Sequence, residues 1–288
     1  MQELAREEWI AAASAQALRL APYLDPHLAR REAREAHPVH DFLFTYYSFR
    51  PAQLLRFHPG YGVRLRDAPE YDDVRGYAEG AVTPAHLAEQ LPLVRRLHAL
   101  LTATHARPAH LGCFGLHEWA MVHRADETRH PRPLRLGAAG TDAVVEGHRI
   151  GCSHFDAFRF FTPSARPLNT LSPGRDDRAQ FEQPGCLHAG MDLYKHAFRL
   201  SPLLPSSLVV DAFELAWDIR ILDMRAAPYD MTGLRLDPHG EEWTPVPIET
   251  PEGKQAYVAA QRGFAERAAP IREALISACE GLLVSAGS

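Results

Sequence analysis

The sequence has few lysines, few cysteines and no long apolar run. Lys195 and Lys254 are its only lysines in 288 residues, so chemistry that needs a lysine Schiff base has two candidates. The four cysteines are too few for a disulfide framework, and we expect reduced thiols. No apolar segment approaches the roughly 20 residues that span a bilayer, and the N-terminus lacks the pattern of a signal peptide. These absences predict a cytoplasmic protein without a membrane partner.

A strong excess of basic residues is also missing. The formal net charge is −5 and the isoelectric point is near 6.3, which argues against tight, nonspecific binding of nucleic acid. A local group of arginines can still contact phosphates. Hydrophobic residues make up 46% and charged residues 23% of the chain, as in an ordinary soluble globular protein.

Helical periodicity dominates the chain, and no long repeat or low-complexity segment interrupts it. We therefore predict a mainly α fold with a small β element, arranged as a single compact α+β domain over residues 1–288. Its parts are N-terminal helices at 1–57, a mixed middle at 58–161, a polar loop at 162–185 and C-terminal helices at 186–284.

Proline and capping residues divide these parts into elements. The first 21 residues predict one helix, and Asp25-Pro26 begins a second. HFDAFRFF (154–161) alternates as a strand does, which would place His154, Asp156 and Phe158 on one face. The other expected elements are a largely helical 37–58, a turn and short strand at 58–67, a helix from Thr83-Pro84 to about 105, a short helix within 110–124, a strand-like or irregular 130–161, and helices at about 186–200, 206–226 and 251–284.

The densest group of reactive side chains lies in GCLHAGMDLYKH (185–196). On a helix, His188, Asp192, Lys195 or His196, and Arg199 form one face, opposite an apolar face. That face is either a solvated surface or part of a site. A Gly-Cys pair followed closely by His occurs at 112–117, 151–154 and 185–188, which favours a site.

The following helix, VVDAFELAWDIRILDMR, is apolar nearly all round and is expected to be buried. Asp211, Glu214 and Asp218 form a narrow stripe along it. Buried carboxylates need partners, and the His, Lys and Arg side chains of the preceding helix are the natural ones. The stripe is either a buried ion-pair network or contains a catalytic carboxylate.

Metal binding is a further alternative for the His and acidic residues. The His-Glu pair at 117–118 lacks the i, i+4 histidine spacing of zincins, and the sequence has no CxxC motif. The pairs Asp192/His196 and Glu214/Asp218 have the ligand types of helical di-metal sites without the Glu-x-x-His spacing. We therefore assign no metal and no cofactor.

Several sequence blocks are distinctive when taken together. They are HPVHDFLFTYYSFRPAQLLRFHPG (37–60), GCSHFDAFRFF (151–161), EQPGCLHAGMDLYKHAF (182–198), FELAWDIRILDMRAAPYD (213–230) and IETPEGKQAYVAAQR (248–262). Together they resemble an actinobacterial-type protein family catalogued as 3-methyladenine DNA glycosylase. No helix-hairpin-helix motif, familiar from other alkyladenine glycosylases, is recognisable. The resemblance implies a hydrolase that excises alkylated purines such as 3-methyladenine from damaged DNA in base-excision repair.

Such chemistry needs a flipped-out base, an aromatic stack and a carboxylate near the sugar. We expect Asp156 or Asp192 to be the carboxylate, with His154 and His188 orienting water or the base. The acidic net charge predicts weak to moderate affinity for DNA. Candidate substrate-binding residues are Tyr46, Tyr47, Phe158, Tyr194, Arg159 and Lys195, with Arg166, Arg175 and Arg178 near the long loop as further phosphate contacts.

Two other functions compete with this hypothesis. The same His and Asp cluster could serve an enzyme that acts on a small molecule, with or without a metal ion. The polar stripes could also be buried salt bridges of a noncatalytic binding protein. The sequence leaves the oligomeric state open.

Overall fold

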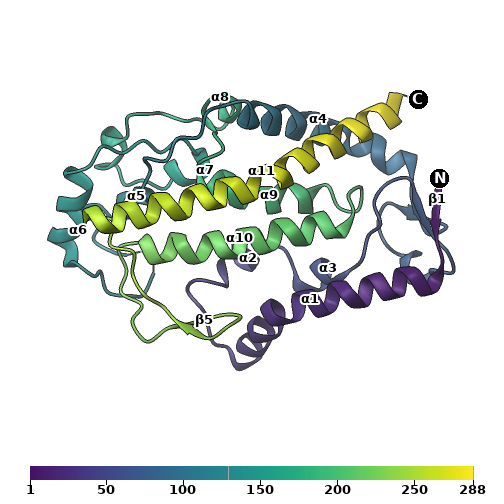
Figure 1. The fold of residues 1–288 in the computed structure, drawn as a ribbon, viewed down its shortest axis with the longest axis horizontal. Coiled ribbons are helices and arrows are strands. Elements are labelled where there is room, and N and C mark those ends of the chain that lie inside the picture. Colours follow the sequence, from purple (N-terminus) through teal and green to yellow (C-terminus); the bar gives the residue numbers. More distant parts are fainter. Residues whose placement is uncertain (129, 288) are drawn as a thin grey trace.

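Figure 1 shows the fold in a computed structural model, which describes residues 1–128 and 130–287. Eleven α-helices and six short strands form within these residues, which confirms the predicted mainly α fold with a small β element. The helices are α1 (Arg6–Ala33), α2 (Phe42–Thr45), α3 (Pro51–Leu55), α4 (Pro84–His105), α5 (Leu116–Ala120), α6 (Gly137–Glu146), α7 (Phe155–Phe158), α8 (Arg178–Phe181), α9 (Leu187–Arg199), α10 (Ser206–Ala226) and α11 (Pro251–Gly287).

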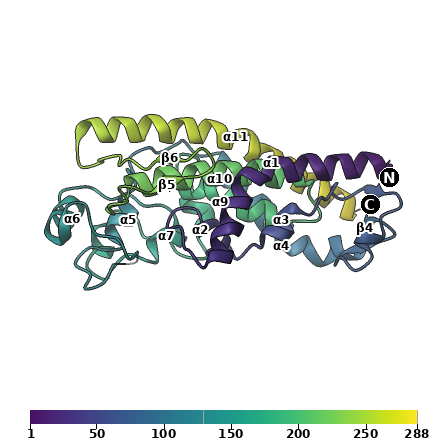
Figure 2. The same ribbon diagram turned by 90° about the horizontal axis from the view of Figure 1, so that it is seen from below.

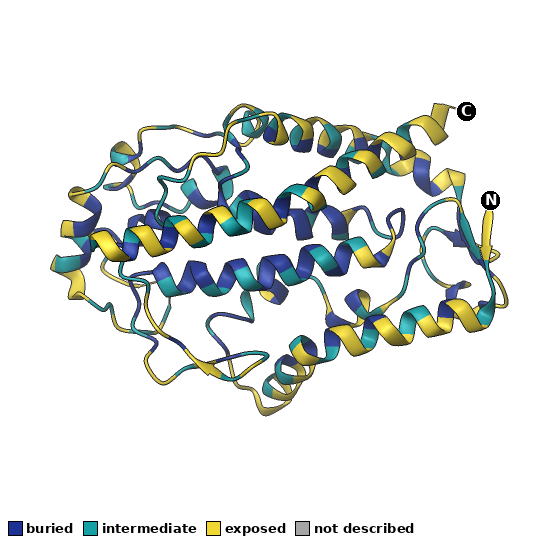
Figure 3. Cartoon of the chain, viewed as in Figure 1, coloured by how far each residue is buried: buried dark blue, intermediate teal, exposed yellow. Residues whose placement is uncertain are grey.

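Two central helices, α9 and α10, organise the core. They pack side by side, and α11 packs across both and against α4 (Figure 1). In the turned view, α11 lies on one side of this pair and α2 and α7 lie on the other (Figure 2). Burial follows the same order, because α9 and α10 are largely covered while α1, α4 and α11 each keep an exposed face (Figure 3). The all-round apolar character of α10 therefore predicts its burial correctly.

The β structure is small. Four short strands form one sheet in the order β1-β2-β4-β3, with β1 parallel to β2 and the other pairs antiparallel. The predicted turn and strand at 58–67 are confirmed by β2, and Thr83 caps α4 by accepting a hydrogen bond from the His86 amide. The strands are β1 (Gln2–Leu4), β2 (Val63–Leu65), β3 (Tyr77–Ala78), β4 (Ala81–Val82) and a separate hairpin of β5 (Arg235–Leu236) and β6 (Glu241–Glu242).

The N-terminal region differs from the predicted pair of helices. A single helix, α1, continues through Pro22 and Pro26. A proline inside a helix removes a backbone hydrogen bond and costs about 3 kcal/mol or more. Burial of Leu20, Leu24 and His27 on both sides of the prolines holds the two halves on the core. Tertiary packing therefore outweighs the local break.

The stretch 37–58 is less helical than expected. Only α2 and α3 form there, because Ser48 adopts a left-handed conformation (φ 58°) and Pro51 begins a new helix. Nor is the stretch 130–161 strand-like throughout. Residues 137–146 form α6, which buries Thr141, Val144 and Val145 at helical spacing.

The predicted strand at 154–161 is wrong. The amides of Ala157 and Phe158 donate to the carbonyl of His154, and the segment forms the short helix α7. His154 and Ala157 are both buried three residues apart, which is helical spacing and not the alternation of a strand. Among the described residues, no helix is long and apolar enough to cross a membrane.

Candidate functional site

The polar face of α9 points into the protein. His188, Asp192 and Lys195 share this face, as predicted, but Asp192 is buried and the other two are only partly exposed. The opposite face, with Met191 and Tyr194, is buried as well. A solvated surface is therefore excluded for this segment.

Asp192 is the centre of a buried charged cluster. The hydroxyl of Tyr47 donates to Asp192 Oδ1 at 3.1 Å, while Arg178 Nη2 and Lys195 Nζ donate to Oδ2 at 2.7 and 2.9 Å. His154 Nε2 lies 3.4 Å from the same oxygen. Both carboxylate oxygens of Asp192 are thus fully engaged by protein groups. We call Asp156, Glu182, Asp192, His154, Arg178 and Lys195 the Asp192 cluster.

Opposite charges fix the protonation states within this cluster. Burial alone would raise the pKa of Asp192, but the charges of Lys195 and His154 outweigh it and hold that pKa well below its usual range. Burial would also lower the pKa of Lys195, yet Asp192 and Asp156 raise it above its ordinary value. Lys195 is therefore an ammonium ion and not a nucleophilic amine.

A cavity of about 290 Å³ lies beside this cluster. Two of its aromatic rings, Phe42 and Tyr46, stack with centroids 4.7 Å apart. The guanidinium of Arg220 lies 4.1 Å from the centroid of the Phe42 ring. The residues that line the cavity are Phe42, Thr45, Tyr46, Glu118, Met121, His130, Asp156, Phe160, His188 and Arg220.

Asp156 is the carboxylate of the Asp192 cluster that reaches the cavity. Its Oδ2 accepts a hydrogen bond from Lys195 at 2.9 Å, whereas among the described residues its Oδ1 has only the more distant Arg159 Nε at 3.5 Å. Its side chain is 18% exposed, compared with 3% for Asp192. Burial would raise the pKa of Asp156, but Lys195 outweighs it and the pKa is lowered. Asp156 thus presents an ionised carboxylate with one available oxygen.

A second buried cluster borders the cavity through Glu118 and Arg220. His117 Nε2 lies 2.9 Å from Asp223 Oδ1, and Arg220 Nη1 donates to Asp223 Oδ2 at 2.7 Å. Glu118 lies 3.5 Å from Arg220. Burial would lower the pKa of His117, but Asp223 raises it well above the usual range, so the two form an ion pair. We call His117, Glu118, Arg220 and Asp223 the Asp223 cluster.

His188 lies between the two clusters. Its ring centroid is 4.4 Å from that of His117 and 5.4 Å from that of His154. Burial lowers the pKa of His188 to about 3, so its imidazole is neutral at physiological pH. Within the described residues its side chain forms no hydrogen bond, which leaves its ring nitrogens available to a ligand.

The three Gly-Cys segments meet in space. Cys113, Cys152 and Cys186 line a small cavity of about 10 Å³ together with His117 and His188. All are free thiols. Burial raises the pKa values of Cys152 and Cys186 well above the usual range, so both stay protonated and poorly nucleophilic.

The predicted buried stripe on α10 is wrong. Asp211 and Glu214 pair with Arg19 of α1 at 2.7 and 2.6 Å, and Asp218 pairs with Arg267 of α11 at 2.7 Å. The three carboxylates are 45, 24 and 39% exposed, and Asp211 and Glu214 line an open groove together with Arg19 and Arg267. The buried charges of α10 are instead Arg220 and Asp223. In the sequence they form an i, i+3 Arg-Asp pair, a spacing that is as compatible with an exposed pair as with a buried one.

The predicted aromatic contacts lie in different places. Tyr46 lines the cavity, and Tyr47 binds Asp192. Tyr194 is fully buried among other aromatic rings, and Phe158 packs edge-on against Phe161. Neither Tyr194 nor Phe158 is among the residues that line the cavity.

The arginines predicted to bind phosphate also have different surroundings in the structure. Arg159 is exposed and donates to the Tyr46 hydroxyl at 3.3 Å. Arg178 is held by Glu182 and Asp192, so it is not free to contact phosphate. Arg166 donates to backbone carbonyls, and Arg175 is exposed.

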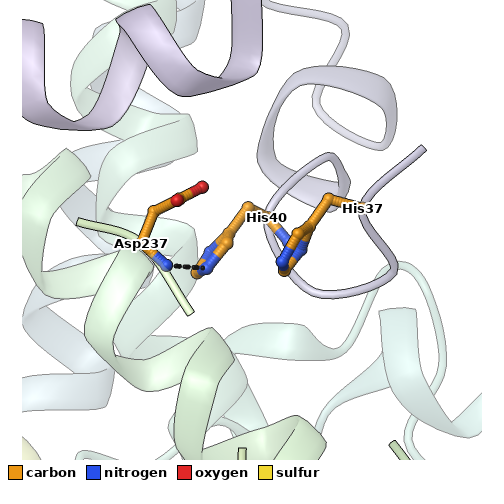
Figure 4. A group of neighbouring side chains, drawn as sticks. All are labelled: His37, His40 and Asp237. Atoms are coloured by element: carbon orange, nitrogen blue, oxygen red, sulfur yellow. Dashed lines mark hydrogen bonds between the residues drawn. The ribbon is translucent and has the colours of Figure 1, made fainter. Parts of the chain in front are cut away.

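Two groups of His and acidic residues have the composition of metal ligands. In the first group, His37, His40 and Asp237 already bind other protein groups; Figure 4 shows the hydrogen bond between Asp237 and His40. The Asp237 amide donates to His40 Nε2, His37 Nε2 donates to the Arg235 carbonyl, and the Asp237 carboxylate pairs with Arg30. This group links the segment before α2 to the β5–β6 hairpin. The other group is His117, His188 and Asp223 beside the cavity.

Comparison with known proteins gives no relative. No protein-family model matches the chain, and no curated protein or solved structure is significantly similar to it.

Proposed function

We propose that the protein is a hydrolase that excises an alkylated purine such as 3-methyladenine from damaged DNA. One observation carries the proposal: the cavity combines stacked aromatic rings with Asp156, a carboxylate that keeps one oxygen available. The residue types match what cleavage of an N-glycosidic bond requires, namely a surface for the base and a negative charge for the sugar.

The size and chemistry of the cavity suit a single base. Its volume of about 290 Å³ is just below the usual range of ligand pockets, roughly 300–1,000 Å³. An N-alkylated purine in DNA is flat and positively charged, so it gains from aromatic faces and nearby carboxylates. Tyr46 and Phe160 offer aromatic surface, whereas the faces of Phe42 are already taken up by Tyr46 and Arg220, and Glu118 and Asp156 offer the negative charge.

Asp156 takes the part of the catalytic carboxylate in this proposal. As the bond between the sugar and the base breaks, its electron pair neutralises the cationic purine, and positive charge develops on the sugar. The ionised Asp156 stabilises that charge. Water then adds to the sugar and releases its proton to solvent. His188 is a weak base because its pKa is about 3, so it does not take the proton. The N–H of its neutral ring orients the water by donating a hydrogen bond.

An open groove beside the cavity supports a nucleic-acid substrate. The groove has a volume of about 490 Å³ and shares Tyr46 and Asp156 with the cavity. Arg159, Lys195 and Arg199 line it. Within the described residues, the Arg199 guanidinium has no hydrogen-bond or ion-pair partner. Phosphates next to a flipped-out nucleotide would find cations there.

The test compares base release by the wild type and by Asp156→Asn on methylated duplex DNA. We expect the variant to lose about 100-fold or more in rate, as when one transition-state contact is removed. Asp218→Asn is the matched control, because its exposed carboxylate is remote from the cavity lining and should leave the rate unchanged. An Asp156→Asn variant as active as the wild type would remove Asp156 from the mechanism. Release from alkylated nucleosides but not from DNA would favour the small-molecule alternative.

A further inference from the structure

Three ligand atoms converge at the inner wall of the cavity. One atom each from His117, His188 and Asp223 lies within 4.8 Å of the other two. The residues belong to α5, α9 and α10, so the helical framework that forms the core also fixes the distance between them. From this geometry we propose that His117, His188 and Asp223 bind a divalent transition-metal ion of the Zn²⁺ class.

The donor set suits such an ion. Two imidazoles and one carboxylate are a common ligand set for zinc and for non-haem Fe²⁺. His188 lines the cavity and has no hydrogen bond within the described residues, so a ring nitrogen is free to bind. Asp223 Oδ1 lies 2.9 Å from His117 Nε2, so two of the three donor atoms are already adjacent. A metal would replace the proton that His117 shares with Asp223.

The distances require only a small adjustment. Ligand atoms at about 2.0–2.1 Å from a tetrahedral zinc lie roughly 3.3 Å apart. The contact between His117 Nε2 and Asp223 Oδ1 is 2.9 Å, which is slightly shorter than that separation. The donor atoms of the group lie within 4.8 Å of one another. To reach a separation of about 3.3 Å, the His188 nitrogen has to move inward by at most about 1.5 Å, which a change in its side-chain torsions can supply.

Neighbouring residues hold the ligands in place. Arg220 donates to Asp223 Oδ2, which leaves Oδ1 on the side of His117. Glu118 lies near Arg220 and balances its positive charge. Cys113 Sγ lies 3.9 Å from His117 Nδ1, the ring nitrogen away from Asp223. Such outer contacts orient metal ligands in known sites.

The proposed ion would have an open position toward the cavity. Three protein ligands leave one place of a tetrahedral ion for water or substrate, as in catalytic zinc sites. His188 lines the cavity, so the open position faces the space in which a ligand would bind. This inference does not rest on the proposed glycosylase function.

The experiment measures metal on the full-length protein, independently of any activity. Chelator-treated protein is titrated with Zn²⁺ and with Co²⁺, and bound metal is measured by elemental analysis and by the visible absorption of Co²⁺. We expect about one ion per chain for the wild type. His188→Ala is the main variant because no hydrogen bond within the described residues is lost; it should weaken binding at least 10-fold.

The His37 group provides the matched control. His37→Ala removes a histidine from a group of the same composition, and binding at the proposed site should be unchanged. The proposal is overturned if folded wild type binds neither ion, if His188→Ala binds as tightly as the wild type, or if only His37→Ala reduces binding. Because the metal measurement needs no substrate, its outcome is independent of whether the protein releases base from DNA.

Discussion

Replacing Asp192 with asparagine should destabilise the protein strongly. The substitution keeps the size of the side chain but removes the negative charge that Arg178 and Lys195 share. Breaking a buried ion pair by removing one partner costs about 3–5 kcal/mol. In the variant, Glu182 still pairs with Arg178 and Asp156 still pairs with Lys195. We therefore expect a loss of stability at the lower end of this range, about 3 kcal/mol. At about 2–4 °C per kcal/mol for a chain of this size, the midpoint of thermal unfolding should fall by roughly 6–12 °C.

The assay is thermal unfolding followed by circular dichroism at pH 7. Asp218→Asn is the control, because its exposed pair with Arg267 should contribute less than about 1 kcal/mol. The pKa of Asp192 is depressed in the folded protein, so its stabilisation is complete above the unfolded pKa of about 4 and is lost as pH falls through the folded value. The difference between variant and wild type should therefore narrow in acid. An Asp192→Asn midpoint within about 2 °C of the wild type at pH 7 would refute this reasoning.

Two further predictions concern Lys195 and the start of α11. Wild-type protein should release base without cutting the DNA strand, because Lys195 is an ammonium ion held by Asp156 and Asp192. If borohydride traps a covalent adduct between Lys195 and abasic DNA, this prediction is wrong. Gly253→Ala should prevent stable folding, because the new Cβ would lie 1.9 Å from the Pro247 carbonyl oxygen. Gly263→Ala is the control, because its new Cβ would have no atom of the described residues within 4 Å. It should leave stability unchanged or raise it by up to about 1 kcal/mol. Equal unfolding midpoints for the two variants would contradict the prediction, since the contact at Gly253 would then have relaxed.

Long helices with periodic apolar residues were predictable from the sequence, whereas short helices and the positions of buried polar residues were not. The helices α4, α9, α10 and α11 follow from their apolar spacing, and α4 and α11 also from the threonines that cap them. The segment that carries Asp156 is a helix of four residues, too short for periodicity to distinguish it from a strand.

The positions of the charges on α10 depended on its neighbours. Asp218 and Asp223 are both acidic residues on one apolar helix, and the sequence does not distinguish them. Packing leaves Asp218 exposed beside α11 and buries Asp223 against His117 of α5. Which carboxylate is buried is thus decided by tertiary contacts that no local pattern encodes.

Release of free base from methylated duplex DNA by purified wild-type protein tests the proposed function most directly. The reaction is run with enzyme in excess, both with and without added Zn²⁺, and the protein is shown to be folded by circular dichroism. We predict release of 3-methyladenine well above the spontaneous rate, with the DNA strand left uncut. A folded protein that releases no base under either condition would contradict the assignment of the cavity and Asp156 to N-glycosidic cleavage in DNA.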